Sequence, residues 1–239
     1  MNWLLYLTLG LAPSIIWLLF FLKKDIHPEP KGMVLKIFFF GLLITLPAIF
    51  IERGIFEEFV KLNLPQILYI FFGIALVEET LKYLVVKEKV VSDPEFDEPL
   101  DAMLYMIISA LGFAALENLL FFFSPEIFLL QFEEILILVS FRFITATFLH
   151  ALCSGLVGYF LAQSFFETKN RFKLITTGLG IATILHGLYN FSIMTMEGPG
   201  RFLIPLIILI GLAFVISLGF KKLEKMKSIC KIKYNGYFF

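Results

Sequence analysis

The stretch "GIALVEETLKYLVV", residues 73–86, belongs to an apolar segment long enough to cross a membrane, yet it contains three charged residues near its middle. These residues are Glu78, Glu79 and Lys82. A charge at the centre of a bilayer costs about 2.5–3.5 kcal/mol even on the most permissive insertion scales. One lysine cannot neutralise two carboxylates, and ionisable groups inside a membrane usually mark a functional site. This stretch therefore predicts both a membrane helix and a site within it.

The composition around this stretch is that of a membrane protein. The chain has 239 residues, of which 59% are hydrophobic, and its mean hydropathy is +0.88. Soluble domains are about 45–50% apolar. The formal net charge of zero argues against a nucleic-acid-binding protein. Cys153 and Cys230 provide neither a disulfide framework nor a CxxC metal site.

The apolar blocks predict an all-α fold, a polytopic membrane helix bundle. A helix needs roughly 20 apolar residues to cross the hydrocarbon core. The first block has no basic leader and no small-residue cleavage site, so we expect it to be a retained helix. The segment 126–139 contains Glu133 and Glu134 and is predicted to form a short interfacial or re-entrant helix. The seven predicted spans are 2–22, 34–51, 66–87, 101–123, 140–165, 173–194 and 202–220.

Basic residues predict the orientation of these spans. Fifteen lysines and arginines lie in the first, third and fifth connections and in the C-terminal tail, against three in the alternate connections. By the positive-inside rule, the N-terminus is then outside and the C-terminus cytoplasmic, in a multi-pass protein of the cell membrane. We expect a single transmembrane domain over residues 1–220 and a basic cytoplasmic tail over 221–239 that favours anionic membrane lipid.

Further polar residues interrupt the other predicted spans, and helical spacing organises them. His150 and Ser154 are four residues apart, as are His186 and Asn190, so each pair shares a helix face. Asn118, Ser154 and Asn190 fit hydrogen bonding between membrane helices, and Ser154 is taken as a packing residue. Arg142 is expected near the outer boundary, with its side chain reaching the interface. Glu79, Glu117, His150 and His186 fall roughly 12–24 Å from the cytoplasmic ends of their helices, so they can share one mid-membrane layer.

Two kinds of hydrolytic chemistry suit such a layer. One glutamate of a close pair can act as a general base on water, while a histidine and Asn190 stabilise the oxyanion. Alternatively, Glu79, His150 and His186 could bind zinc, with a zinc-bound water as the nucleophile. The sequence has no HExxH motif, no pair of aspartates within the spans, and no GxSxG-like turn around Ser154. These absences argue against zincin, aspartyl and serine protease sites.

Five ordered blocks resemble the PrsW family of intramembrane proteases, which is related to the group of CAAX prenyl-protein proteases and bacteriocin-processing membrane proteases. The resemblance extends over residues 10–195 and includes an EExxK motif in "VEETLKY", an EN pair in "FAALENLLFF" and a histidine and an asparagine in "LHGLYN". The remaining blocks are "LAPSIIWLLFFLKKDIHPEP" and "RFITATFLHALCSGLVGYF". The resemblance implies that the catalytic residues are Glu78, Glu79, Glu117, His150 and His186, with Lys82, Asn118 and Asn190 in support.

The family resemblance also implies a substrate class. It suggests a peptidase that makes the first cut in a single-span membrane protein such as an anti-sigma factor, by a glutamate-dependent mechanism for which a metal has also been proposed. Two alternative functions, from other classes of protein, would use the same cluster of glutamates and histidines. One is a proton-coupled membrane transporter, although the spans contain no internal repeat. The other is a non-enzymatic membrane scaffold, in which the change Glu79→Gln would leave function intact.

Overall fold

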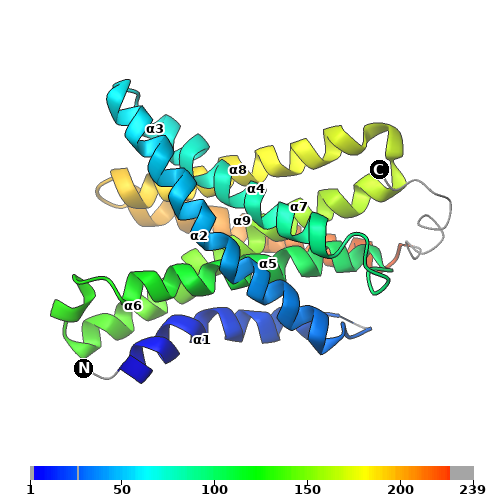
Figure 1. The fold of residues 1–239 in the computed structure, drawn as a ribbon, viewed down its shortest axis with the longest axis horizontal. Coiled ribbons are helices and arrows are strands. Elements are labelled where there is room, and N and C mark those ends of the chain that lie inside the picture. Colours follow the sequence, from blue (N-terminus) through cyan, green and yellow to red (C-terminus); the bar gives the residue numbers. More distant parts are fainter. Residues whose placement is uncertain (1–2, 26, 227–239) are drawn as a thin grey trace.

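The computed structural model describes residues 3–25 and 27–226. Within these residues every regular element is helical, which confirms the all-α prediction. Figure 1 shows most of the long helices running roughly along the length of the bundle, with α2 crossing them obliquely and the successive connections alternating between the two ends. Residues 227–239, most of the predicted basic tail, lie outside the described residues.

The elements are α1 (Trp3–Leu22), α2 (Lys31–Lys61), α3 (Gln66–Leu68), the π-helix η1 (Tyr69–Ala75), α4 (Leu76–Lys89), α5 (Pro99–Phe122), η2 (Ile127–Leu129), α6 (Phe132–Ile144), α7 (Ala146–Phe166), η3 (Thr168–Asn170), α8 (Arg171–Thr195) and α9 (Gly200–Leu223).

Six helical segments among the described residues are long and apolar enough to span a membrane. They are 3–22, 31–61, 99–122, 132–166, 168–195 and 200–223. The third predicted span is also helical, over residues 66–89, but Glu78, Glu79 and Lys82 reduce its apolar character. Counted with this charged helix, the described residues contain the seven membrane helices that the sequence predicts.

Several boundaries differ from the predicted ones. Helix α2 continues to Lys61, ten residues beyond the predicted end of its span, so Glu52 and Arg53 are helical rather than part of a connection. The short helix predicted over 126–139 is α6, but its bounds are Phe132–Ile144, and a capping box between Gln131 and Glu134 starts it. Only Thr145 separates α6 from α7, so the charged segment is the first part of one long, kinked span.

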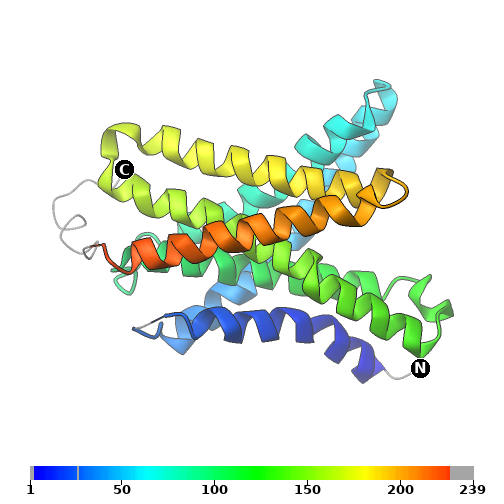
Figure 2. The ribbon, with the colours of Figure 1, turned by 180° about the vertical axis from the view of Figure 1, so that it is seen from behind.

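Helix α5 forms the centre of the bundle. Most of its residues are buried, and α1, α2 and α7 pack around it. Two glycines bring α2 and α5 into backbone contact: a Cβ at Gly41 would lie 2.1 Å from the carbonyl oxygen of Ser109, and one at Gly112 would lie 2.0 Å from that of Phe38. Small residues allow this close packing between membrane helices, where burial in lipid gives no hydrophobic driving force. Figure 2 shows α9 on the opposite side, lying along α7 and α8.

The helix that carries "VEETLKY" starts with a π-helical turn. Residues 69–75 adopt π-helical hydrogen bonding, and regular α-helix resumes at Leu76, two residues before Glu78. Such turns insert an extra residue into a helix, which rotates the following side chains relative to a regular helix. The paired glutamates therefore begin a new helical register directly after the π-helix, in contact with α2, α5 and α8.

Candidate active site

The charged residues of α4 meet α7 and α8 inside the bundle. The Nζ atom of Lys82 lies 2.8 Å from Oε1 of Glu79, 3.2 Å from Oε2 of Glu78 and 2.8 Å from Nδ1 of His150. Glu79 and Lys82 are fully buried. The ammonium also lies 4.6 Å from the centre of the Phe113 ring. A buried charge is stable only when it is paired and hydrogen-bonded, and Lys82 satisfies both conditions.

The two adjacent glutamates have different surroundings. Glu79 Oε1 accepts from Lys82 and lies 2.9 Å from Nδ1 of His186, and its Oε2 accepts a 2.8 Å hydrogen bond from Ser154. Glu79 is not among the residues that line the adjacent pocket, whereas Glu78 is. Ser154 was expected to be a packing residue, but it contacts this carboxylate directly because α7 lies against α4. The structure therefore separates a fully bonded inner glutamate, Glu79, from a pocket-facing one, Glu78.

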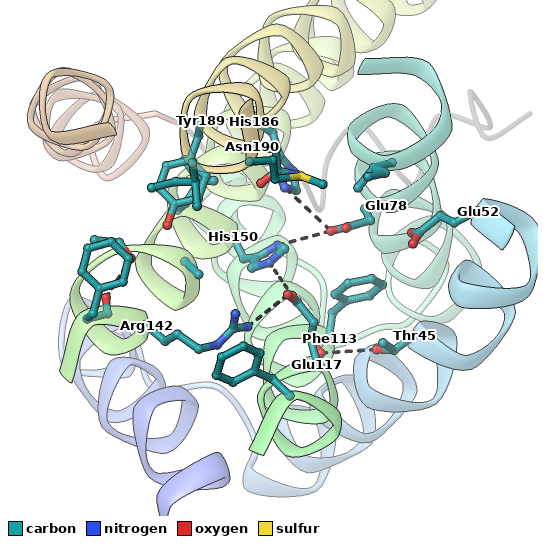
Figure 3. A pocket seen from close by; sticks show the side chains of 18 of the residues that line it. Thr45, Glu52, Glu78, Phe113, Glu117, Arg142, His150, His186, Tyr189 and Asn190 are labelled. Atoms are coloured by element: carbon teal, nitrogen blue, oxygen red, sulfur yellow. Dashed lines mark hydrogen bonds and ion pairs between the residues drawn. The ribbon is translucent and has the colours of Figure 1, made fainter. Parts of the chain in front are cut away.

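Each histidine is held by a carboxylate on one ring nitrogen. His150 Nε2 lies 2.8 Å from Oε2 of Glu117, and His186 Nδ1 is held by Glu79. The other nitrogens face Glu78: its Oε2 atom is 3.6 Å from His150 Nδ1 and 3.9 Å from His186 Nε2. The two imidazoles meet edge to face, with their centres 5.0 Å apart. Figure 3 shows Glu78, Glu117, His150 and His186 converging on the pocket from α4, α5, α7 and α8.

Arg142 binds the glutamate and the asparagine of the EN pair. Its Nη2 lies 3.0 Å from Oε1 of Glu117, and its Nε donates a 2.7 Å hydrogen bond to Oδ1 of Asn118. Asn118 also donates to Oγ1 of Thr147. The expectation that Arg142 would extend to the membrane boundary is therefore wrong. Arg142 lies in the last turn of α6, and its side chain turns toward α5, where only 16% of it is exposed.

A cavity of about 500 Å³ lies beside these residues. Its wall includes Glu78, Glu117, His150 and His186 together with Asn190, and Figure 3 shows them around one space. Lys82, Glu79 and Asn118 support this wall from behind. The lining residues that sequence reasoning missed include Glu52, Thr45 and Tyr189. Glu52 lay beyond the predicted end of its span, and no periodicity distinguished the other two.

Glu78, His150 and His186 form the group best suited to hold a metal ion. One donor atom from each lies within 4.8 Å of the others, and all three residues are buried. The sequence suggested Glu79 for this set, but in the structure Glu78 takes that place because Glu79 is engaged by Lys82, Ser154 and His186. Metal-binding histidines usually donate their second ring N–H to a carboxylate, as both histidines can here. Two histidines and one glutamate also form a known donor set for catalytic zinc, so the residue types fit such an ion, which would replace the Lys82 ammonium as the partner of His150 Nδ1.

Comparisons with known proteins match most of the chain. A family model described as "PrsW family intramembrane metalloprotease" matches residues 29–223. The Protease PrsW of Oceanobacillus iheyensis is 31% identical over 85% of this chain and 90% of its own length. The proteins of the same name from Geobacillus kaustophilus and Bacillus subtilis are 30% and 28% identical, and the matches cover 92% and 93% of this chain and 90% and 96% of theirs. No solved structure matches the chain.

Proposed function

Since the chain belongs to the PrsW family of intramembrane proteases, we propose that it hydrolyses a peptide bond of a single-span membrane protein in the pocket beside Glu78, His150 and His186. One observation carries this proposal. Two buried histidines, each held by its own carboxylate, face a third carboxylate at the wall of a cavity inside a helix bundle. Packing alone does not require such an arrangement, whereas activation of a water molecule does.

We propose that Glu78, His150 and His186 hold a metal ion, with zinc as the first candidate. Such an ion, when bound, acts as a Lewis acid and lowers the pKa of a coordinated water. Glu79 fixes the orientation of His186, and Glu117 fixes that of His150, so that one nitrogen of each ring faces Glu78. The buried Lys82 ammonium offsets the negative charge of Glu78 and Glu79.

Glu117 is the carboxylate best placed to move the proton. It lines the cavity, 37% of its side chain is exposed there, and Arg142 supports its ionised form through the 3.0 Å ion pair. In the proposed reaction, Glu117 takes a proton from the attacking water and passes it to the amide nitrogen as the C–N bond breaks. The Asn190 amide, on the α8 side of the cavity, is the proposed donor to the carbonyl oxygen as negative charge develops on it.

The position of the cavity bears on where the substrate is cut. Met194 and Arg201 line it, and they flank the connection between α8 and α9. The cavity therefore lies nearer to the end of the bundle that carries connections 62–65, 123–131 and 196–199. By the positive-inside prediction this is the outer face of the cell membrane. We infer a cut in the outer half of the substrate's membrane segment, as a first cut in an anti-sigma factor requires.

The proposed substrate has to be selected mostly within the membrane. The connections at that end of the bundle are short, and none of the described residues forms a separate recognition domain. We propose that residues 1–220 act as one protease domain, with the basic segment 221–239 on the cytoplasmic side against anionic lipid.

The test is co-expression with a tagged panel of single-span anti-sigma factors from the same host. Wild type, Glu78→Gln and Glu88→Gln are compared. Glu88 lies on the same helix but is exposed and away from the cavity. We expect a shortened fragment with wild type and with Glu88→Gln, and none with Glu78→Gln. Fragments with all three proteins would indicate a host protease and contradict the proposal. If folded wild type and both variants leave every panel member intact, the proposed anti-sigma substrate class is wrong.

A further inference from the structure

The cavity wall contains five charged side chains, and two of them have no partner in the part of the chain that the structure describes. Glu78 is paired with Lys82, and Glu117 with Arg142. Within residues 3–25 and 27–226, neither the Glu52 carboxylate nor the Arg201 guanidinium makes an ion pair or hydrogen bond. Glu52 lies on α2 and Arg201 lies on α9, and both line the same cavity. The mechanism proposed above uses neither of them.

Glu52 is directed into the cavity by the geometry of α2. Thr45, Ile49 and Glu52 all line the cavity, and their spacing places them on one face of this helix. The adjacent Arg53 points elsewhere: it is exposed and lies 3.5 Å from Glu57. Figure 3 shows the Glu52 carboxylate oriented toward Glu78. A half-buried carboxylate on a largely apolar wall is unfavourable unless a counter-charge is supplied.

We propose that Glu52 is a specificity-determining residue that binds a lysine or arginine side chain of the substrate close to the bond that is cut. This inference rests on the proposed proteolytic function. A cationic side chain would provide the counter-charge that Glu52 lacks among the described residues, through a charge-assisted hydrogen bond. Arg201 lines the same cavity from α9 and repels a cation, so Glu52 is the more favourable position for one.

The charge pattern of the cavity also orients the substrate. Where the bound peptide approaches Arg201, the guanidinium favours an acidic or neutral residue of the substrate. We therefore expect a preference for a basic residue on one side of the scissile bond. Replacement of that residue by glutamine should lower kcat/KM on the order of 10-fold or more, because the Glu52 carboxylate would be left unpaired beside the bound peptide.

The test uses reporters that share one membrane segment and differ only in the residues near the end of that segment. These positions carry mixtures of lysine, glutamine, glutamate and alanine. The reporters are co-expressed with wild type, Glu52→Gln, Glu52→Lys or Arg53→Gln, and the new termini are identified by mass spectrometry. Arg53→Gln is the matched control, since it removes a neighbouring charge outside the cavity.

We expect wild type and Arg53→Gln to prefer a basic residue at one fixed position relative to the cut. Glu52→Gln should lose this preference, and Glu52→Lys should shift it toward glutamate. A reversed preference in Glu52→Lys can arise only from folded, active protein with a changed charge at residue 52. This variant therefore tests the proposal even if Glu52→Gln is less stable than wild type. Cleavage by Glu52→Gln with the wild-type profile would overturn the proposal. So would a uniform fall in rate with an unchanged profile, which would assign Glu52 to proton transfer instead. Absence of cleavage of every reporter by wild type would overturn the proposed function and this inference together.

Discussion

Nδ1 of His186 lies 2.9 Å from Oε1 of Glu79, although 107 residues of chain separate the two positions. This contact joins α8 to α4 and turns the other nitrogen of the ring toward Glu78. Glu79 thereby acts on the cavity through His186 and not directly. The two neighbouring glutamates of "VEETLKY" consequently have different roles, which single substitutions can separate.

Glu78→Gln and Glu79→Gln should reduce proteolysis to different extents. Glu78 faces the cavity as a proposed metal ligand, so the change removes the charge of that ligand, and we expect a fall in cleavage rate of more than about 100-fold. Glu79→Gln keeps an oxygen opposite His186 but removes its charge, and we expect a fall of about 10–100-fold. Cleavage rates of folded, purified protein measure both effects. Equal losses in the two variants would contradict the division of roles.

Removal of divalent metal should abolish activity and lower thermal stability. The proposed ligands Glu78, His150 and His186 come from three helices, so a bound ion would link α4, α7 and α8. When the concentration of the free ion is 100 times its dissociation constant, binding stabilises the folded state by about 2.7 kcal/mol. We expect zinc to raise the melting temperature of chelator-treated wild type and to restore cleavage. His186→Ala should show neither response. A wild-type protein that is equally active and stable without metal would exclude the metal-dependent mechanism.

Arg142→Gln should impair both stability and activity, because it leaves Glu117 without its counter-charge. The pair is partly exposed, at 16% and 37% of the side chains, so we expect a loss of about 1–3 kcal/mol, less than for a fully buried pair. The double variant Arg142→Gln with Glu117→Gln should recover part of the stability but none of the activity. Thermal unfolding of the two single variants and the double variant measures this coupling. Additive losses of stability would show that the ion pair contributes little.

The sequence predicted the helix bundle and most of the site because both depend on strong local signals. Runs of apolar residues identify membrane helices, and an ionisable residue within such a run is conspicuous. Glu78, Glu79, His150 and His186 were therefore identified before their helices were placed, and the structure brings them together. The i, i+4 spacing could indicate which of these residues share a helix face but not which helices are neighbours.

The remaining parts of the site depend on helix ends and on packing. Glu52 and Arg142 were misplaced because charged residues near the end of a span resemble an interfacial segment in sequence. In the structure α2 continues to Lys61 and α6 begins at Phe132, and both residues face the cavity. The π-helix over 69–75 also has no clear sequence signal, yet it sets the register of the glutamate pair. Such features follow from contacts between helices, which periodicity within one helix does not reveal.

Gly41→Ala should destabilise the bundle more than Gly54→Ala, although both lie on α2. A Cβ at Gly41 would lie 2.1 Å from the carbonyl oxygen of Ser109, so the backbones of α2 and α5 would have to separate. Overpacking of this kind typically costs about 1–3 kcal/mol. A Cβ at Gly54 would meet no atom within 4 Å, and alanine should there gain up to about 1 kcal/mol from helix propensity. Thermal unfolding in detergent compares the two variants, and equal melting temperatures would contradict the close contact.

Glu29→Gln should make stability less dependent on pH. Glu29 precedes α2, accepts a hydrogen bond from the hydroxyl of Tyr105, and has its pKa raised from 4.5 to about 9 by burial and by the negative charge of Asp101. Burial also raises the pKa of the nearby Asp25. Between the unfolded pKa of 4.5 and the folded pKa of about 9, the folded protein binds more protons than the unfolded chain. The free energy of unfolding therefore falls as pH rises through this window.

Glutamine imitates the protonated side chain, so Glu29→Gln should match wild type near pH 4.5 and exceed it in melting temperature as the pH approaches about 9. The control is Glu95→Gln, which removes the same charge from an exposed position in the connection between α4 and α5 and should follow the wild-type curve. Melting temperatures across this pH range test the prediction. If Glu29→Gln and wild type lose stability in parallel as pH rises, then Glu29 does not hold its proton in the folded protein.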